Sequence, residues 1–231
     1  MKQKKDRQKI YFTSDLHFCH TNILYHCPER RNFLGISLEE LQNDKKGTTE
    51  LMNQKLIELW NNTVRKQDSI YFLGDFCLAN KVETKKILEQ LHGKKYLIVG
   101  NHDNSLKGLE NYFEDVSQIK ELKVTNNQFK FIDPDEPFCL EMCHYPLLTW
   151  NRRLHGTIML HGHCHGSLNY YNNTSKELRL DVGFDSSVFR HQFIEVEDLY
   201  KYFVSLREQL DCKTFEEYTN KLIDLKNAVR G

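Results

Sequence analysis

Three histidines alternate with other residues directly behind an apolar run in TIMLHGHCHG, residues 157–166. Side chains two positions apart point to the same side of an extended segment. We therefore expect His161, His163 and His165 to present their imidazoles to one shared object. Whether that object is a metal ion depends on which other ligands the chain supplies.

Polar clusters of the same kind end several other short apolar runs. The runs occur in KIYFTSDLH, SIYFLGD, YLIVGNHD and FCLEMCHYP, and more weakly in ELRLDVGFD. They predict buried strands with polar residues at their C-terminal ends, the edge at which open α/β sheets bind ligands. Metal-compatible side chains at five strand ends indicate one composite site. The clusters are Asp15-x-His17, Gly74-Asp75, Gly100-Asn101-His102-Asp103, His144 and Gly162-His163-Cys164-His165.

The segments between these runs predict helices at 48–64 and 80–93 and a β-hairpin within 124–142. A spacing of three and four residues gives the first helix one apolar face. That face consists of Met52, Leu56, Leu59 and Thr63.

The last thirty-five residues predict two amphipathic helices in a hairpin. We divide the chain into a domain at 1–197 and a helical extension at 198–231. Short heptad runs favour packing of these helices on their own chain over a homodimer seam. The apolar positions are Leu199, Phe203, Leu206, Leu210, Phe215, Tyr218, Leu222, Leu225 and Val229.

The composition disfavours several classes of protein. The 231 residues include 32 Lys and Arg and 32 Asp and Glu, so no global basic field favours a long nucleic acid as partner. No run approaches the length of a membrane span, and the basic start leads into no apolar stretch. The seven cysteines form no C-x-x-C pair, which favours reduced thiols and a cytoplasmic protein.

The five clusters, in this order, resemble the motifs of the calcineurin-like metallophosphoesterases: D-x-H, G-D, G-N-H-D or G-N-H-E, a lone His, and G-H-x-H. The segments SDLHFCHTNI, LGDF, HYPLLTW and LHGHCHG are similar to a small bacterial and phage-type branch of that family. The resemblance covers residues from about 10 to about 197. It implies an α/β fold, a four-layer α/β/β/α sandwich of two mixed sheets. Cys19 departs from the branch, which usually has Gly there.

The resemblance also implies a centre of two divalent metal ions. Their oxygen and nitrogen ligands suit borderline ions, so we expect Mn²⁺, with Zn²⁺, Fe²⁺, Ni²⁺ or Mg²⁺ as alternatives. His163 and His165 would each serve a different ion. The implied ligands are Asp15, His17 and His165 for the first ion, Asn101, His144 and His163 for the second, and Asp75 as the bridge.

The implied reaction is hydrolysis of a phosphomonoester or phosphodiester by a metal-bridging hydroxide. His102 would face the substrate and stabilise charge or protonate the leaving oxygen, and Asp103 would orient His102. The expected substrate is a small phosphate ester or nucleotide, or the end of a nucleic acid. Protein phosphatase activity is disfavoured, because Phe18 and Leu78 stand where that class has Gly and Asp. A non-catalytic interaction scaffold is the alternative, against which the presence of His102 argues.

Residues near that ligand set have open roles. His20 and Asn22 can touch the substrate phosphate or serve only the loop, and Arg31 can clamp a phosphate or form a surface ion pair. We expect His161 to pack in the core or to support a ligand. We expect Cys164 to be a buried thiol on the opposite side of the strand.

Overall fold

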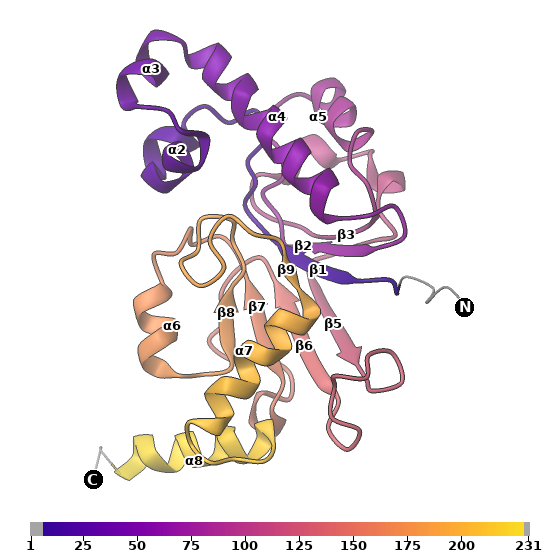
Figure 1. Cartoon of the computed structure of the whole chain (residues 1–231), viewed down its shortest axis with the longest axis vertical. Coiled ribbons are helices and arrows are strands. Elements are labelled where there is room, and N and C mark those ends of the chain that lie inside the picture. The colour runs from indigo at the N-terminus through magenta and orange to yellow at the C-terminus, as the bar shows by residue number, and fades with distance from the viewer. Residues whose placement is uncertain (1–6, 229–231) are drawn as a thin grey trace, which may run out of the picture.

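A computed structural model describes residues 7–228 as two β-sheets with flanking helices (Figure 1). The strand order is β4-β3-β2-β1-β9 in the first sheet and β5-β6-β7-β8 in the second. Only β9 in the first sheet and β5 in the second are antiparallel to their neighbours, so both sheets are mixed, as predicted. The strands are β1 (Ile10–Thr13), β2 (Ser69–Phe72), β3 (Lys94–Ile98), β4 (Asp115–Ser117), β5 (Ile119–Val124), β6 (Phe138–Cys143), β7 (Ile158–His161), β8 (Arg179–Asp181) and β9 (Ile194–Glu195).

Helices connect the strands and cover the first sheet. Among residues 7–228, none of these helices combines the length and the apolar character that a membrane crossing requires. The α-helices are α1 (Ile23–His26), α2 (Pro28–Leu34), α3 (Leu38–Asn43), α4 (Lys45–Thr63), α5 (Lys81–Leu88), α6 (Asn169–Ser175), α7 (Val196–Glu208) and α8 (Phe215–Ala228). The short 3₁₀ helices are η1 (Asp103–Leu106), η2 (Glu110–Tyr112) and η3 (Arg153–His155).

The helix predicted at 48–64 is the longer α4, and its buried face differs from the predicted one. Met52 and Leu56 are buried, but Trp60 completes the face in place of Leu59, and the Trp60 indole donates to the carbonyl of His92. An antiparallel hairpin is present as β5 and β6, but its first strand ends at Val124, where the predicted hairpin began, so only the second strand lies where we expected it. Helix α5 ends at Leu88 and not near residue 93, because two residues of tight turn follow it.

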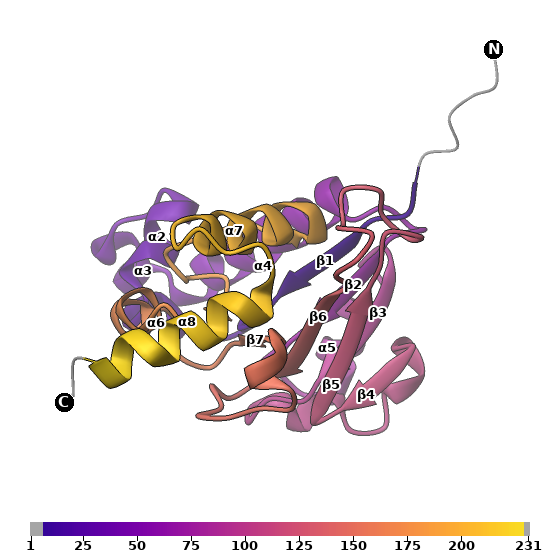
Figure 2. The ribbon, with the colours of Figure 1, turned by 90° about the horizontal axis from the view of Figure 1, so that it is seen from below.

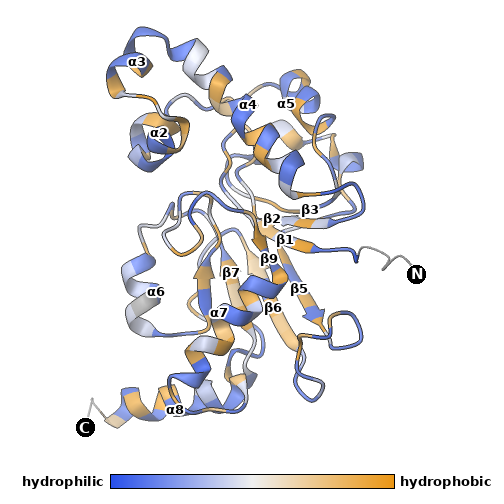
Figure 3. Ribbon diagram, in the orientation of Figure 1, coloured by the Kyte–Doolittle hydropathy of each residue, from blue (hydrophilic) through white to orange (hydrophobic). Residues whose placement is uncertain are grey.

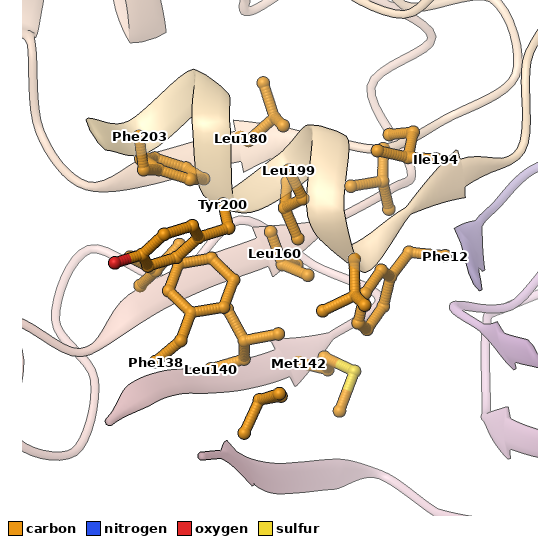
Figure 4. Packing of buried hydrophobic residues seen from close by; sticks show 14 of the residues in the cluster. Phe12, Phe138, Leu140, Met142, Leu160, Leu180, Ile194, Leu199, Tyr200 and Phe203 are labelled. Atoms are coloured by element: carbon orange, nitrogen blue, oxygen red, sulfur yellow. The ribbon is translucent and has the colours of Figure 1, made fainter. Parts of the chain in front are cut away.

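The main core lies between the two sheets, because alternate residues of each strand point to opposite faces. Phe12 of β1 and Leu140 of β6 point into this core, and Leu160 of β7 and Leu180 of β8 join them (Figure 4). The opposite face of the first sheet packs against α4 and α5 in a second core. Strand β6 is accordingly largely apolar in Figure 3, whereas β5 and the helices alternate between polar and apolar residues.

The C-terminal helices contribute to the core between the sheets. Leu199 and Phe203 of α7 are 0% exposed and lie over the second sheet (Figure 4), while Phe215 and Tyr218 of α8 join the same cluster. Helix α7 also runs beside β1 (Figure 2). The boundary that we placed between 197 and 198 therefore falls inside α7, and Val229 lies outside the described residues.

We predict that Phe203→Ala lowers the free energy of unfolding by about 3–5 kcal/mol, the usual cost of emptying a buried aromatic site. Urea denaturation followed by circular dichroism measures this change. Leu225→Ala on α8 is the matched control, because Leu225 is 48% exposed and its loss should leave stability nearly unchanged. Equal effects of the two substitutions would contradict the packing of α7 into the core.

Candidate metal centre

The C-terminal ends of β1, β2 and β3 meet those of β6, β7 and β8 at a seam between the two sheets. The seam is closed by a parallel bridge between Ser14 and Gly183, and the Phe184 N–H donates to the Ser14 carbonyl at 3.0 Å. His163 crosses the seam as well, because its N–H donates to Asp15 Oδ2 at 2.9 Å. Clusters that are far apart in the sequence therefore lie together.

The glycines of the motifs allow the loops to approach so closely. Gly74 has φ +90°, and a Cβ at this position would lie 2.5 Å from the backbone nitrogen of Gly100. A Cβ on Gly162 would lie 2.5 Å from Asp15 Oδ2. Side chains at these positions would force the strand ends apart, and only glycine adopts the first conformation freely.

Five of the seven candidate ligands have left-handed backbone conformations, with φ between 46° and 68°. Such conformations cost of the order of 1–3 kcal/mol each for residues other than glycine, and they persist where surrounding structure enforces them. Here the backbone N–H groups of Asp15 and His17 donate to Gly74 and Asp75, each at 3.0 Å. The five residues are Asp15, His17, Asp75, His163 and His165.

The first group of candidate ligands consists of Asp15, His17 and His165, whose ligand atoms lie within 4.8 Å of one another. His17 Nε2 is 3.2 Å from His165 Nε2, and His165 Nε2 is 3.9 Å from Asp15 Oδ1. Asp15 is 0% and His17 2% exposed. This is the set that the resemblance assigned to the first ion.

The second group consists of Asp75, His144 and His163, again within 4.8 Å. Asn101 joins it, because its Oδ1 lies 3.0 Å from both His144 Nε2 and His163 Nδ1. These residues come from the ends of β2, β3, β6 and β7.

Asp75 lies between the two groups. Its Oδ2 is 3.6 Å from His17 Nε2, and its Oδ1 is 3.6 Å from His144 Nε2. The Oδ1 atom also accepts the backbone N–H of His102 at 2.8 Å. Each oxygen of one carboxylate therefore faces a different group, which is the arrangement that a bridging ligand needs.

The tautomers of the imidazoles suit cations in both groups. His144 Nδ1 donates to the carbonyl of Leu73 at 2.7 Å, so His144 Nε2 directs a lone pair at Asn101 Oδ1. His165 Nδ1 contacts Asp185 Oδ2 at 3.1 Å and leaves its Nε2 facing His17. The lone pairs of His144 Nε2 and Asn101 Oδ1 therefore converge without a proton between them and repel, and a divalent cation would relieve that repulsion.

Protons compete with metal ions for the buried groups. Burial raises the pKa of Asp15 to about 8 and lowers the pKa of His17 to about 2. Burial alone would lower the pKa of His165, but the hydrogen bond to Asp185 and the charge of Asp15 raise it to about 10. Because ligands must be deprotonated, metal binding here would release protons.

His102 and Asp103 have different surroundings. The His102 side chain is exposed on the cavity wall, with its ring centroid 5.6 Å from that of His17. Asp103 does not have the position that we expected beside His102. Its buried carboxylate accepts the backbone N–H groups of Asp75 at 3.0 Å, Phe76 at 2.8 Å and Gly100 at 2.7 Å. Asp103 therefore holds two ligand-bearing loops together.

Of the three expected substrate contacts, His20 alone lines the cavity. Its Nδ1 is 3.2 Å from His17 Nδ1. Asn22 is exposed at the start of α1. Arg31 does not line the cavity, and its guanidinium donates to the carbonyl of Leu24. The preceding residue of α2, Arg30, is the arginine that points into the protein.

The premise of an extended GHCHG segment is wrong. Strand β7 ends at His161, and the left-handed conformations of His163 and His165 turn their side chains toward different groups. His161 is buried, with Nδ1 2.9 Å from the Gly162 carbonyl and Nε2 3.2 Å from the Asn172 amide. Cys164 lines the cavity and is half-buried, unlike the buried thiol that we expected.

A buried ion pair that was not predicted from the sequence lies beneath the site. The Arg30 guanidinium is 0% exposed and contacts Asp185 through Nε at 2.9 Å and Nη2 at 2.7 Å. It also donates to the carbonyls of Asp15 and Leu16. Asp185 in turn orients His165. The strand-like run that ends at Asp185 could have indicated Asp185 as a site residue. No sequence motif marks Arg30.

A cavity of about 650 Å³ opens over both groups. One side is formed by candidate ligands, His20 and His102, and the other by α1, α2 and the residues between them. Cys27 on that second side lies within 4.8 Å of ligand atoms of His165 and Asp185.

Comparisons with known proteins identify the family of the chain. The model of the calcineurin-like phosphoesterase family matches residues 8–193. The uncharacterized protein MJ1445 of Methanocaldococcus jannaschii is 33% identical over 162 residues, 69% of this chain and 71% of that protein. The Gene 66 protein of Mycobacterium phage D29 is 26% identical over 200 residues, 77% of this chain and 88% of that protein.

A solved structure supports the fold. The crystal structure of AQ665, a protein of unknown function from Aquifex aeolicus, superposes with a TM-score of 0.56 and 20% identity, covering 85% of this chain and 100% of that one. Relatives from a phage and an archaeon suit the small branch that the motifs indicated. The chain belongs to the calcineurin-like phosphoesterases, and at the general level it is a metal-dependent phosphoesterase.

Proposed function

We propose that the protein is a two-metal phosphohydrolase that cleaves a small phosphomonoester or phosphodiester. The observation that carries the proposal is the position of Asp75, with one oxygen toward His17 and the other toward His144. Asp15, His17 and His165 would hold one ion, and Asn101, His144 and His163 the other. The substrate that we expect is a nucleotide or the end of a nucleic acid.

Bound divalent ions would acidify a water molecule and offset negative charge on the phosphoryl oxygens. Side chains of the protein would donate the proton and bind the phosphate. His102 is exposed on the cavity wall, so its imidazole can reach the substrate and donate a proton to the leaving oxygen. His20 faces the same cavity and can bind a phosphoryl oxygen.

The donor set favours borderline divalent ions over magnesium, and Mn²⁺ is the ion of this group that we propose. Two carboxylates, one amide oxygen and four imidazoles form a mixed oxygen and nitrogen environment, which suits borderline ions such as Mn²⁺, Fe²⁺ and Zn²⁺ better than Mg²⁺. Elemental analysis of the protein as purified identifies the ion.

We predict that Asp75→Asn loses bound metal and hydrolyses bis-p-nitrophenyl phosphate no faster than buffer. The neutral amide of asparagine carries no negative charge toward either group of ligands. Mass spectrometry of metals after loading with manganese measures the first effect, and release of p-nitrophenolate the second. Asp115→Asn on β4 is the control, since Asp115 lies on the surface in an ion pair with Lys120. Full metal content together with full turnover in Asp75→Asn would refute the proposal.

We predict that His102→Ala lowers kcat by about 10²- to 10⁴-fold, the usual contribution of a general acid, while metal content stays unchanged. The side chain lies on the cavity wall and outside both ligand groups, so its loss should leave the ions in place. Unchanged kcat in this variant would show that His102 does not protonate the leaving oxygen.

We predict that Asp185→Asn weakens metal binding by about 10- to 100-fold, because the partner that orients His165 loses its charge. Competition with a fluorescent chelator measures the affinity. Thermal denaturation measures the stability of the same variant, because the buried Arg30 loses its ion-pair partner. A variant that keeps full affinity would show that Asp185 serves folding alone.

A further inference from the structure

Two cysteines lie directly behind the candidate ligands of two neighbouring strands. Cys19 follows His17 by two residues after β1, and Cys77 follows Asp75 by two residues after β2. A parallel bridge pairs Phe18 with Cys77, so the two cysteines lie on adjacent, paired segments. Both are free thiols in this structure, and neither belongs to the metal centre that we propose.

The backbone of Cys19 turns its side chain toward Cys77. In extended backbone, residue 19 would point away from the side that the bridged pair Phe18 and Cys77 share. The φ of Cys19 is +61°, which breaks that alternation. The Cys77 thiol donates a hydrogen bond to the Cys19 sulfur. A left-handed conformation costs free energy for a residue other than glycine, so it indicates a constraint at this position.

Other contacts hold the two cysteines in place. Asn53 of α4, itself buried, accepts the backbone N–H of Cys19 through Oδ1 at 2.8 Å and donates from Nδ2 to Cys19 Sγ at 3.4 Å. On the other segment, Ser105 Oγ donates to the carbonyl of Cys77 at 2.9 Å. The two sulfur atoms are therefore held side by side from both segments.

The spacing of the two segments suits a disulfide. Neighbouring strands lie about 4.8 Å apart and rise about 3.3 Å per residue. For two residues that are offset by one position across a bridge, these values give about 6 Å between the Cα atoms. Disulfides span about 4.4–6.8 Å between Cα atoms. The pair can therefore close without a rearrangement of the fold.

We propose that Cys19 and Cys77 form a redox-modification site, at which a peroxide converts the two thiols to a reversible disulfide that weakens metal binding. The bond would join the loops that carry His17 and Asp75, and it would draw the Cys19 sulfur away from Asn53. Because Asp75 faces both ligand groups, a displacement of its loop would disturb both. The effect on metal binding rests on the proposed function, whereas the disulfide itself does not.

The two thiols differ in exposure, which sets the order of the reaction. Cys77 is 0% exposed and Cys19 is partly exposed, so a small peroxide reaches Cys19 first. The Cys19 sulfur attacks one oxygen of hydrogen peroxide, the O–O bond breaks, and one water leaves with the thiol proton, which gives a sulfenic acid. The Cys77 sulfur then attacks the sulfenic sulfur and releases a second water. Two thiols lose two electrons and two protons, and one peroxide becomes two water molecules.

Peptide mapping tests the disulfide. The protein as purified is treated with hydrogen peroxide, which catalase then removes, and remaining thiols are alkylated before digestion without reductant. We expect one crosslinked pair of peptides, which dithiothreitol separates. Fragmentation of the pair should place the bond between Cys19 and Cys77, and not at Cys27, which is close to Cys19 in the sequence. Absence of this crosslink would overturn the inference, whatever the metal affinity.

Competition with a fluorescent chelator measures the affinity for Mn²⁺ before and after peroxide. We expect a fall of about 10-fold, as for lost support around a ligand, and recovery with dithiothreitol. Cys19→Ser should abolish both the crosslink and the fall, and Cys77→Ser should do the same. Cys139→Ser is the matched control and should keep both effects, because Cys139 on β6 is partly exposed like Cys19.

A fall in affinity that persists in Cys19→Ser would overturn the inference, and so would a crosslink that leaves the affinity unchanged. A failure of the proposed function is distinguishable from both. In that case the protein binds no Mn²⁺ before peroxide is added, while the crosslink still forms.

Discussion

Burial of the Asp75 carboxylate is the constraint on which the site depends. This side chain is 2% exposed, and each of its oxygens faces an imidazole from a different sheet. A buried charge is costly unless positive charge or hydrogen-bond donors surround it. The backbone N–H of His102 supplies one donor, and the carboxylate of Asp103 fixes the loops on both sides. Two cations would supply the remaining stabilisation, so the fold is organised around charge that the polypeptide alone does not balance.

A second layer of charged groups supports the candidate ligands. Asp185 orients His165, and Arg30 neutralises Asp185 while binding the carbonyls that precede His17. The left-handed conformations of the candidate ligands are thus held by interactions on several sides. Such a site is rigid before any ligand binds, which suits chemistry that depends on fixed positive charge.

The strand ends were predictable, because a buried apolar run followed by Asp, His or Asn marks both the strand and its functional edge. The two-sheet fold class followed from the family resemblance, and the hairpin of β5 and β6 was predicted with its first strand too late in the sequence. Arg30 and the true role of Asp103 were not predictable, since both act through contacts with residues distant in the sequence. The error on GHCHG has another cause: alternation assumes extended backbone, and the left-handed residues break that assumption.

The candidate ligands and the outer wall of the cavity lie on different elements of this fold. The candidate ligands follow β1, β2, β3, β6 and β7, whose packing admits little change without loss of the core. The outer cavity wall belongs instead to α1, α2 and the residue between them, which connect β1 to the rest of the first sheet. A substitution on this wall can therefore change what a bound substituent contacts without moving a candidate ligand. Such separation would let the lining of the cavity change while the candidate ligands stay in place.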